Sequence, residues 1–221
     1  TTGFGIDGNS AEITAAIEAA VADGMNVINL SLGKPEVEPS RDLVVQALDH
    51  AAEAGVVPVV AAGNDFSDFG YGTVGSPANA PDAIAVAAVD SKNSIAYFSS
   101  AGPTPISLEM KPDVAAPGVN VLSSVPGGKW ADSDGTSMAT PAVSGAVALL
   151  KERHPTWTAA ELKSALVETG APAVGPSGGE ALATREGGGV VNLVQADNPL
   201  LFTDPTGLSF GRLGTGASTQ R

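Results

Sequence analysis

Apolar residues alternate along the chain between helical spacing and short continuous runs. Helical spacing predicts helices over residues 10–24, 41–54, 137–152 and 158–169. Continuous runs of Val, Ile, Ala and Leu predict strands over residues 25–32, 56–62 and 83–89. Such runs are typical of strands that are buried on both faces of a parallel sheet. The alternation therefore predicts an α/β fold, a three-layer, doubly wound sandwich with a mostly parallel sheet.

Short polar and glycine signals mark where several of these elements begin and end. Asn9-Ser10 precedes the first helix as a candidate cap, and Gly24 follows it as a stop signal. Thr158, with Glu161 three residues later, predicts a capping box at the start of the last helix. Elsewhere the sequence predicts shorter strands and turns over 95–125, a Pro/Gly-rich loop over 171–189 and a short closing segment at 190–193.

The heptapeptide Gly-Thr-Ser-Met-Ala-Thr-Pro at residues 135–141 carries the clearest chemical signal. It places Ser137 in the first turn of a helix, where free N–H groups and the positive end of the helix dipole face the serine oxygen. Pro141 is expected early enough in the helix that its missing N–H breaks no backbone hydrogen bond. A serine in this setting can act as a nucleophile whose oxyanion is already stabilised. The alternative is that Ser137 is an ordinary N-cap.

A second polar residue stands where a strand of the predicted sheet ends. Asn64 follows the apolar run of residues 56–62, and α/β sheets bind their ligands at the carboxyl ends of strands. Its side-chain amide is suited to donate a hydrogen bond to an oxyanion while the backbone N–H of Ser137 donates from the other side. The alternative is that Gly63-Asn64-Asp65 forms a simple turn, which these residue types favour.

Together these segments resemble the subtilases, the subtilisin-like serine proteases. The heptapeptide is similar to the family's nucleophile motif, and residues 27–33, 59–64, 98–103 and 111–118 resemble further family segments in the same order. The resemblance covers roughly residues 1–196 and has the character of large extracellular bacterial subtilases. It implies a secreted serine endopeptidase that cuts polypeptides through an acyl-enzyme on Ser137, with Asn64 in the oxyanion hole.

The same resemblance implies where a polypeptide substrate would bind. In this family the substrate lies as an extended strand beside edge strands of the protein. By resemblance, Ser31, Leu32 and Gly33 form one wall of the primary specificity pocket, and Ala61, Ala62 and Gly63 form the other. Close packing of a central strand is the alternative explanation for Ala61-Ala62, and the two explanations are compatible.

The chain departs from the family at the catalytic acid and base. A subtilase needs Asp, His and Ser in that order. The two histidines are His50, on a predicted amphipathic helix, and His154, in a last helical turn before proline, and neither lies in a family-like motif. Asp7 has no apolar run before it that would form a buried strand. The catalytic Asp and His are therefore expected on a missing N-terminal segment, and this chain alone is expected to be inactive.

That expectation has consequences for the domain organisation. Residues 1–196 are interpreted as the C-terminal portion of a subtilisin-like peptidase domain that is incomplete at its N-terminal side. Residues 197–221 are interpreted as a linker and the start of a following β-rich domain. An incomplete sheet should leave an apolar face exposed, to be covered by the missing N-terminal segment or by another chain.

Two rival functions are weighed, a pseudoprotease because the base is missing, and an α/β-hydrolase because such enzymes also place a serine at a strand–helix turn. A non-catalytic, peptide-binding pseudoprotease, which keeps the cleft without the triad, stays open. An α/β-hydrolase is excluded, because Ala139 replaces a glycine of its motif and His154 lies a full helix away from Ser137.

The amino-acid composition limits the kinds of partner and cofactor that the chain is expected to bind. Acidic residues outnumber basic ones, 24 to 11, and the formal net charge of −13 disfavours nucleic acid and anionic membranes. The sequence has no cysteine, hence no disulfide or thiolate metal site, and no apolar run long enough to span a membrane. No metal or other cofactor is required by the sequence, although the backbone oxygens of residues 76–82 could offer a weak structural calcium site.

Three further features of the sequence carry weaker signals. Gly127-Gly128-Lys129 lacks the Ser/Thr that a phosphate-binding loop needs. Asp132 and Asp134 fit a solvated loop better than a catalytic carboxylate pair. Glu36 and Glu38 lie in a Pro-rich loop and would bias the cleft toward cationic substrates.

Overall fold

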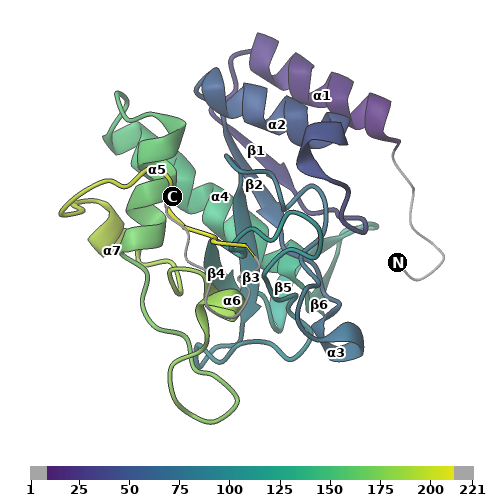
Figure 1. The fold of residues 1–221 in the computed structure, drawn as a ribbon, viewed down its shortest axis with the longest axis vertical. Coiled ribbons are helices and arrows are strands. Elements are labelled where there is room, and N and C mark those ends of the chain that lie inside the picture. The colour runs from purple at the N-terminus through teal and green to yellow at the C-terminus, as the bar shows by residue number, and fades with distance from the viewer. Residues whose placement is uncertain (1–8, 212–221) are drawn as a thin grey trace.

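The computed structural model describes residues 9–211 and is built around one parallel sheet (Figure 1). Its strands are β1 (Val27–Leu30), β2 (Val57–Ala61), β3 (Ile84–Val89) and β4 (Val114–Pro117), in the spatial order β1-β2-β3-β4. All three strand pairs are parallel, and Leu30 of β1, for example, lies beside Val60 of β2. The predicted α/β class with a mostly parallel sheet is confirmed.

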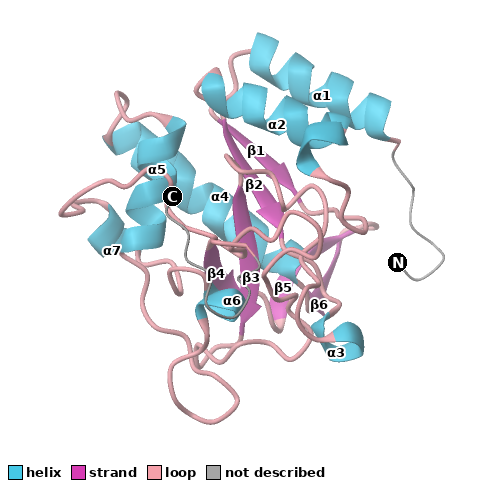
Figure 2. Ribbon diagram, viewed as in Figure 1, coloured by secondary structure: helices cyan, strands magenta, loops and turns pink. Residues whose placement is uncertain are grey.

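Helices cover both faces of this sheet (Figure 2). On one face α1 (Ser10–Ala22) and α2 (Leu43–Glu53) lie against each other, and on the other face lie α4 (Thr136–Arg153) and α5 (Ala159–Glu168). The shorter helices are η1 (Pro39–Arg41), α3 (Phe66–Phe69), α6 (Ala183–Glu186) and α7 (Leu193–Ala196). The arrangement is the three-layer sandwich that the alternating pattern predicted.

Alternation along the central strands divides the core between the two helix layers. Val57 and Val59 of β2 pack with α4 and α5, whereas Val60 packs with α1 and α2. Every residue of β2 and β3 is buried. A strand that is covered on both faces needs apolar side chains at each position, which explains the continuous apolar runs in the sequence.

Side-chain caps fix the starts of the long helices. Asn9 accepts a hydrogen bond from the N–H of Glu12 at the start of α1. Thr158 and Glu161 make both hydrogen bonds of the predicted capping box at the start of α5. All four predicted helices and all three predicted strands occur in the structure. Each of their ends lies within two residues of the predicted end.

An antiparallel hairpin before α4 was not predicted. Its strands are β5 (Val121–Val125) and β6 (Lys129–Ser133), and both are largely exposed. Asp132, which was expected in a loop, therefore lies in a strand. Asp134 accepts a hydrogen bond from the N–H of Asn120 at 2.6 Å and so closes the base of the hairpin. The hairpin leads directly into α4.

The described part of the C-terminal segment, residues 197–211, forms no helix or strand and lies against the domain. The backbone N–H of Thr203 donates to Ser164 of α5 at 2.8 Å, and its hydroxyl donates to Glu168 at 2.6 Å. The Ser209 hydroxyl donates to the carbonyl of Leu108. The following β-rich domain stays a prediction, since residues 212–221 lie outside the described residues, as does Asp7.

Candidate active site

Ser137 is the second residue of α4, and its side chain is half-buried. The N-cap of this helix is Gly135, so the alternative that Ser137 serves as the N-cap is wrong. No acceptor among the described residues takes the backbone N–H of Ser137, as expected for the first turn of a helix. A hydrogen-bond donor is therefore left free directly beside the serine hydroxyl.

Pro141 lies where the helix would normally supply a backbone donor, so the prediction that it breaks no hydrogen bond is wrong. Because α4 begins at Thr136, the nitrogen of Pro141 stands four residues after Ser137 and cannot bond to the Ser137 carbonyl. The hydroxyl of Ser31, just beyond β1, donates to that carbonyl at 2.9 Å instead. Ser31 thus replaces the missing backbone donor.

Further polar side chains extend this link between β1 and α4. The Asn29 side-chain amide donates to the Ser31 hydroxyl at 3.1 Å, and Ser144 of α4 donates to the Asn29 oxygen at 2.9 Å. The Ser137 hydroxyl itself lies 3.4 Å from the backbone carbonyl of Ser31. The start of α4 is therefore tied to the end of β1 on the side where Ser137 lies.

Asn64 lies beside the same helix start, just beyond β2. Its oxygen Oδ1 accepts hydrogen bonds from the N–H of Thr136 at 2.9 Å and from the Thr136 hydroxyl at 3.1 Å. The Thr136 hydroxyl oxygen in turn accepts from the N–H of Gly63 at 3.2 Å. The amide nitrogen of Asn64 comes near Gly135, where an added Cβ would lie 3.6 Å away. Among the described residues this amide nitrogen has no acceptor.

Thr136 is a site residue that the sequence analysis did not single out. It is fully buried and holds Asn64 through both its backbone and its side chain. Its position directly before the serine of the heptapeptide was the only available signal. A threonine hydroxyl can accept and donate at once, which is what the Gly63–Thr136–Asn64 chain requires.

Position 63 requires a glycine, both because of its backbone conformation and because of a close neighbour. Its φ is +110°, a conformation that other residues rarely adopt, and an added Cβ would lie 2.7 Å from the Ser100 hydroxyl. The carbonyl of Gly63 accepts from the N–H of Ser100 at 2.9 Å. Tight contact with Ser100 therefore fixes the path of the chain that leads into Asn64.

The two predicted walls of the specificity pocket follow neighbouring strands. Ser31, Leu32 and Gly33 are exposed beyond β1. Ala61 and Ala62 are only 6% and 1% exposed, so their side chains are packed in the interior. The structure places the two segments at the same carboxyl edge of the sheet, and close packing accounts for the two alanine side chains. The substrate-binding role of all six residues stays a prediction.

Neither histidine approaches Ser137. His50 is exposed near the end of α2. His154 caps the far end of α4, where its ring stacks on Trp157 with centroids 3.8 Å apart and its Nε2 lies 2.9 Å from Asp197. Hydrogen bonds from Arg153 and His154 lower the pKa of Asp197. These contacts give His154 a structural role at the end of α4, and no catalytic role is needed to explain its position.

Glu36 is used within the protein, so the expected bias toward cationic substrates finds no support in its contacts. Its carboxylate accepts from the N–H of Ile106, and from the N–H and hydroxyl of Ser107 at 3.2 and 2.6 Å. Glu38 accepts from the Ser40 hydroxyl. Both carboxylates hold loops together.

The structure thus places a serine at a helix start beside an asparagine at a strand end of a parallel sheet. Residues 4–193 match the family described as the Subtilase family. The chain belongs to this family of serine proteases, as the sequence resemblance predicted.

Relatives of known name agree with this assignment. The chain is 46% identical to a subtilisin of Bacillus pumilus over 157 residues, which are 71% of this chain and 54% of the relative. It is 46% identical to subtilisin E of Bacillus subtilis (strain 168) over 157 residues, 71% of this chain and 39% of the relative. Subtilisin Savinase of Lederbergia lenta is 41% identical over 162 residues, with coverages of 73% and 55%. The chain thus spans about half or less of these relatives.

Solved structures of two proteases share the fold. The prenylagaramide maturation protease PagA has a TM-score of 0.74 at 29% identity, and the match covers 89% of this chain and 70% of PagA. The patellamide maturation protease PatA has a TM-score of 0.73 at 29% identity, with coverages of 86% and 68%. Within residues 9–211, no helix is both long and apolar enough to cross a membrane.

Proposed function

We propose that this chain is the part of a secreted bacterial serine endopeptidase that carries the nucleophile Ser137. The Ser137 oxygen attacks the scissile carbonyl of a polypeptide, the amine of the next residue leaves with a proton, and water then hydrolyses the acyl-enzyme ester. The observation that carries the proposal is the position of Ser137 in the first turn of α4, with a free N–H and with Asn64 held beside it by Thr136.

Two donors form the oxyanion hole in this proposal, the backbone N–H of Ser137 and the side-chain amide of Asn64. The contacts of Thr136 with Oδ1 of Asn64 support this, because they leave the amide nitrogen free to donate. Loss of one such donor costs about 3–4 kcal/mol of transition-state stabilisation in a serine protease.

The general base comes from outside this chain. Both histidines of the sequence are engaged or exposed far from Ser137, and within residues 9–211 the Ser137 hydroxyl has a backbone carbonyl as its one hydrogen-bond partner. Without a base the serine is not activated, so the chain alone is inactive or nearly so. The missing catalytic Asp and His would be supplied by the N-terminal segment of the same protein.

An apolar groove along α4 supports such a partner segment. The groove, about 680 Å³, runs from Pro117 past Pro141 to Glu152. Leu149 is 52% exposed on it, beside small residues of the same helix. Because Pro141 lies about one helical turn from Ser137, a segment seated in this groove reaches the nucleophile. We assign the groove to the segment that carries the catalytic Asp and His.

Substrate would add as an extended strand between the two predicted walls. The segment Ser31–Gly33 continues past the end of β1 and is exposed. Exposed backbone groups in such a segment can pair with a peptide. Secretion is part of the proposal because the named relatives above are bacterial subtilisins.

Labelling with a fluorophosphonate probe, read by intact mass, tests the proposal. The chain alone is expected to stay unlabelled, and a complementing fragment that carries the family's Asp and His motifs is expected to give one label per chain. Ser137→Ala should abolish the label. Ser124→Ala, in the exposed strand β5, is the matched control and should keep it.

Two outcomes would contradict the proposal. Labelling of the chain alone that depends on His154 or His50 would mean that the base lies within the chain. A chain that forms a stable complex with the complementing fragment but stays unlabelled, while it still binds peptides, would favour the non-catalytic peptide-binding module.

A further inference from the structure

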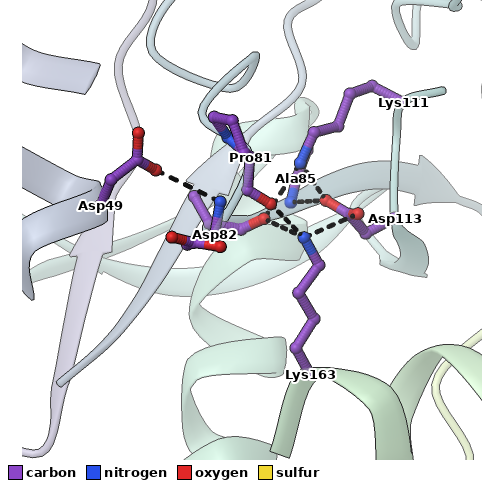
Figure 3. Close-up of polar contacts among 8 residues, drawn as sticks. Asp49, Pro81, Asp82, Ala85, Lys111, Asp113 and Lys163 are labelled. Atoms are coloured by element: carbon purple, nitrogen blue, oxygen red, sulfur yellow. Dashed lines mark hydrogen bonds and ion pairs between the residues drawn. The ribbon is translucent and has the colours of Figure 1, made fainter. Parts of the chain in front are cut away.

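Two lysines from different elements meet at one cluster of oxygen atoms (Figure 3). Lys111 precedes β4 and is 3% exposed, and Lys163 belongs to α5 and is 8% exposed. The oxygens belong to the Asp113 carboxylate and to backbone carbonyls of the segment that precedes β3. The cluster lies away from Ser137 and plays no part in the proposed reaction.

Each ammonium group is bonded to several of these oxygens. Lys163 donates to the carbonyls of Pro81 at 2.6 Å and Ala83 at 3.0 Å, and lies 3.2 Å from Oδ1 of Asp113. Lys111 donates to the same Ala83 carbonyl at 3.0 Å and to Oδ2 of Asp113 at 2.7 Å. Oδ2 of Asp113 also accepts a hydrogen bond from the N–H of Ala85 at 2.7 Å. Both carbonyls and both carboxylate oxygens therefore face a cation.

These oxygens are of the kind that a hard metal ion would otherwise bind. Backbone carbonyls and a carboxylate are the ligands of Ca²⁺, at about 2.3–2.6 Å. The sequence suggested a weak calcium site in residues 76–82, and the Pro81 carbonyl of that segment is one of the oxygens. Two lysine side chains already fill the space between them, so the residues present do not fit a metal ion.

The charge balance points the same way. Two ammonium groups together carry two positive charges, which equals the charge of one calcium ion. Burial alone would raise the pKa of Asp113, but the charges of Lys111 and Lys163 and the hydrogen bonds hold it below its usual value. The neighbouring Asp49 is not hydrogen-bonded to either ammonium group: its carboxylate accepts from the N–H of Asp82 at 3.2 Å (Figure 3) and interacts with the two lysines only at longer range.

We propose that the ammonium groups of Lys111 and Lys163 replace a structural metal ion and fasten the segment before β3 to β4 and α5. This inference does not rest on the proposed protease function. The two ammonium groups make this region independent of calcium. Removal of both lysines is therefore expected to uncover a site for a hard cation.

A cavity beside the cluster would let an ion enter once the lysines are shortened. It has a volume of about 300 Å³ and is lined by Lys111, Lys163 and the carboxylates of Glu53, Asp82 and Asp204. Acidic walls raise the local concentration of cations. An ion that reached the cavity would find the Asp113 carboxylate and the Pro81 and Ala83 carbonyls.

Thermal unfolding of the whole chain, with about 10 mM calcium or with a chelator, tests the proposal. The melting temperature of the unchanged chain is expected to be the same in both to within about 1 °C. Lys111→Ala/Lys163→Ala should melt about 10 °C lower in chelator and recover about 3 °C or more with calcium. Lys111→Met/Lys163→Met is the matched control: it removes the charges, fills the space, and should show no recovery.

If Lys111→Ala/Lys163→Ala does not fold in chelator, the test stays decisive, because the oxygens that both ammonium groups held are then open to an ion. Circular dichroism is expected to show that this variant folds in about 10 mM calcium and that calcium does not change the folding of Lys111→Met/Lys163→Met. Equal responses of the Ala and Met variants to calcium would overturn the proposal. A rise in melting temperature of the unchanged chain with calcium that disappears in Asp113→Asn would overturn it as well.

Discussion

The hydroxyl of Ser31 and the carbonyl of Ser137 are joined by a 2.9 Å hydrogen bond between the end of β1 and the first turn of α4. Pro141 has no N–H to offer the same carbonyl, so the Ser31 hydroxyl supplies a donor where the helix cannot. The proline inside α4 and a serine more than one hundred residues before Ser137 are thus complementary. The backbone of Ser137 is held by a side chain of the sheet as well as by its own helix.

The first prediction concerns this bond. Ser31→Ala should lower the free energy of unfolding by about 0.5–1.5 kcal/mol, because the Ser137 carbonyl loses its donor and the Asn29 amide loses an acceptor at an exposed site. Urea unfolding monitored by circular dichroism measures the change.

Pro141→Ala provides the control for that measurement. An alanine restores the backbone N–H that can bond to the Ser137 carbonyl, so Ser31→Ala should cost less in this background. The two changes should differ from additivity by about 0.5–1.5 kcal/mol. Strict additivity would show that the Ser31 hydroxyl does not substitute for the missing backbone donor.

The second prediction concerns Thr136, which holds Asn64. Thr136→Val keeps the shape of the side chain but removes the hydroxyl, leaving the N–H of Gly63 without its acceptor. The expected cost is about 1–2 kcal/mol of stability. The side-chain amide resonances of Asn64 should also shift in ¹⁵N spectra, since its oxygen loses one of two donors.

Thr136→Ser is the matched variant, because it retains a hydroxyl that can take the same two partners. It should restore the Asn64 resonances and most of the stability. Unchanged Asn64 resonances in Thr136→Val would mean that the backbone N–H of Thr136 alone fixes the amide.

The parts of the fold that could be predicted are those in which residues close together in the sequence share the same surroundings or contact one another. Residues 57–61 and 84–89 are buried on both faces, so their apolar runs predicted strands directly. Thr158 and Glu161 form a cap from neighbouring residues alone, and the spacing was sufficient to find it.

What could not be predicted depends on distant partners or on exposure. The β5–β6 hairpin is largely exposed and therefore carries no apolar alternation that would reveal its strands. The environment of Pro141 required the exact start of α4, and helix ends are the least certain part of a sequence-based prediction. Lys111 and Asp113 are close in sequence, but Lys163 joins them only through the packing of α5.

The third prediction separates backbone strain from steric contact at two glycines. Gly63 has φ +110° and an added Cβ would lie 2.7 Å from the Ser100 hydroxyl, whereas Gly55 has φ +90° with nothing within 4 Å. Gly55→Ala should cost about 1 kcal/mol from backbone strain alone. Gly63→Ala should cost clearly more, about 2–4 kcal/mol, because the contact adds to the strain. Thermal unfolding of the two variants measures the difference.

Ser100→Ala distinguishes the source of the extra cost at Gly63. Removing the hydroxyl relieves the close contact but also removes the acceptor of the Asp65 N–H. Gly63→Ala should therefore cost less in the Ser100→Ala background than in the unchanged chain. Equal costs for Gly63→Ala and Gly55→Ala would show that steric contact with Ser100 contributes nothing.

The fourth prediction concerns the dependence of stability on alkaline pH. Burial lowers the pKa of Lys111 from 10.5 to about 8, and the attraction of Asp113 offsets this only in part. Between these two pH values the unfolded chain keeps its proton on this lysine while the folded chain releases it. Because the unfolded state then binds more protons, the free energy of unfolding rises with pH across this window.

Lys111→Met should remove that rise, which amounts to about 3 kcal/mol at most. Urea unfolding at pH values from 7 to about 10.5 measures it as the difference between the two proteins, because the remaining lysines and tyrosines titrate in both. Asp113, Lys163 and, farther away, Asp49 are the charged groups that face Lys111 in the folded state, and all three remain in the variant. The difference between the proteins should stay constant below pH 7, where Lys111 is protonated in both states. Parallel stability curves up to pH 10.5 would mean that Lys111 keeps its proton in the folded chain and that Asp113 outweighs the cost of burial.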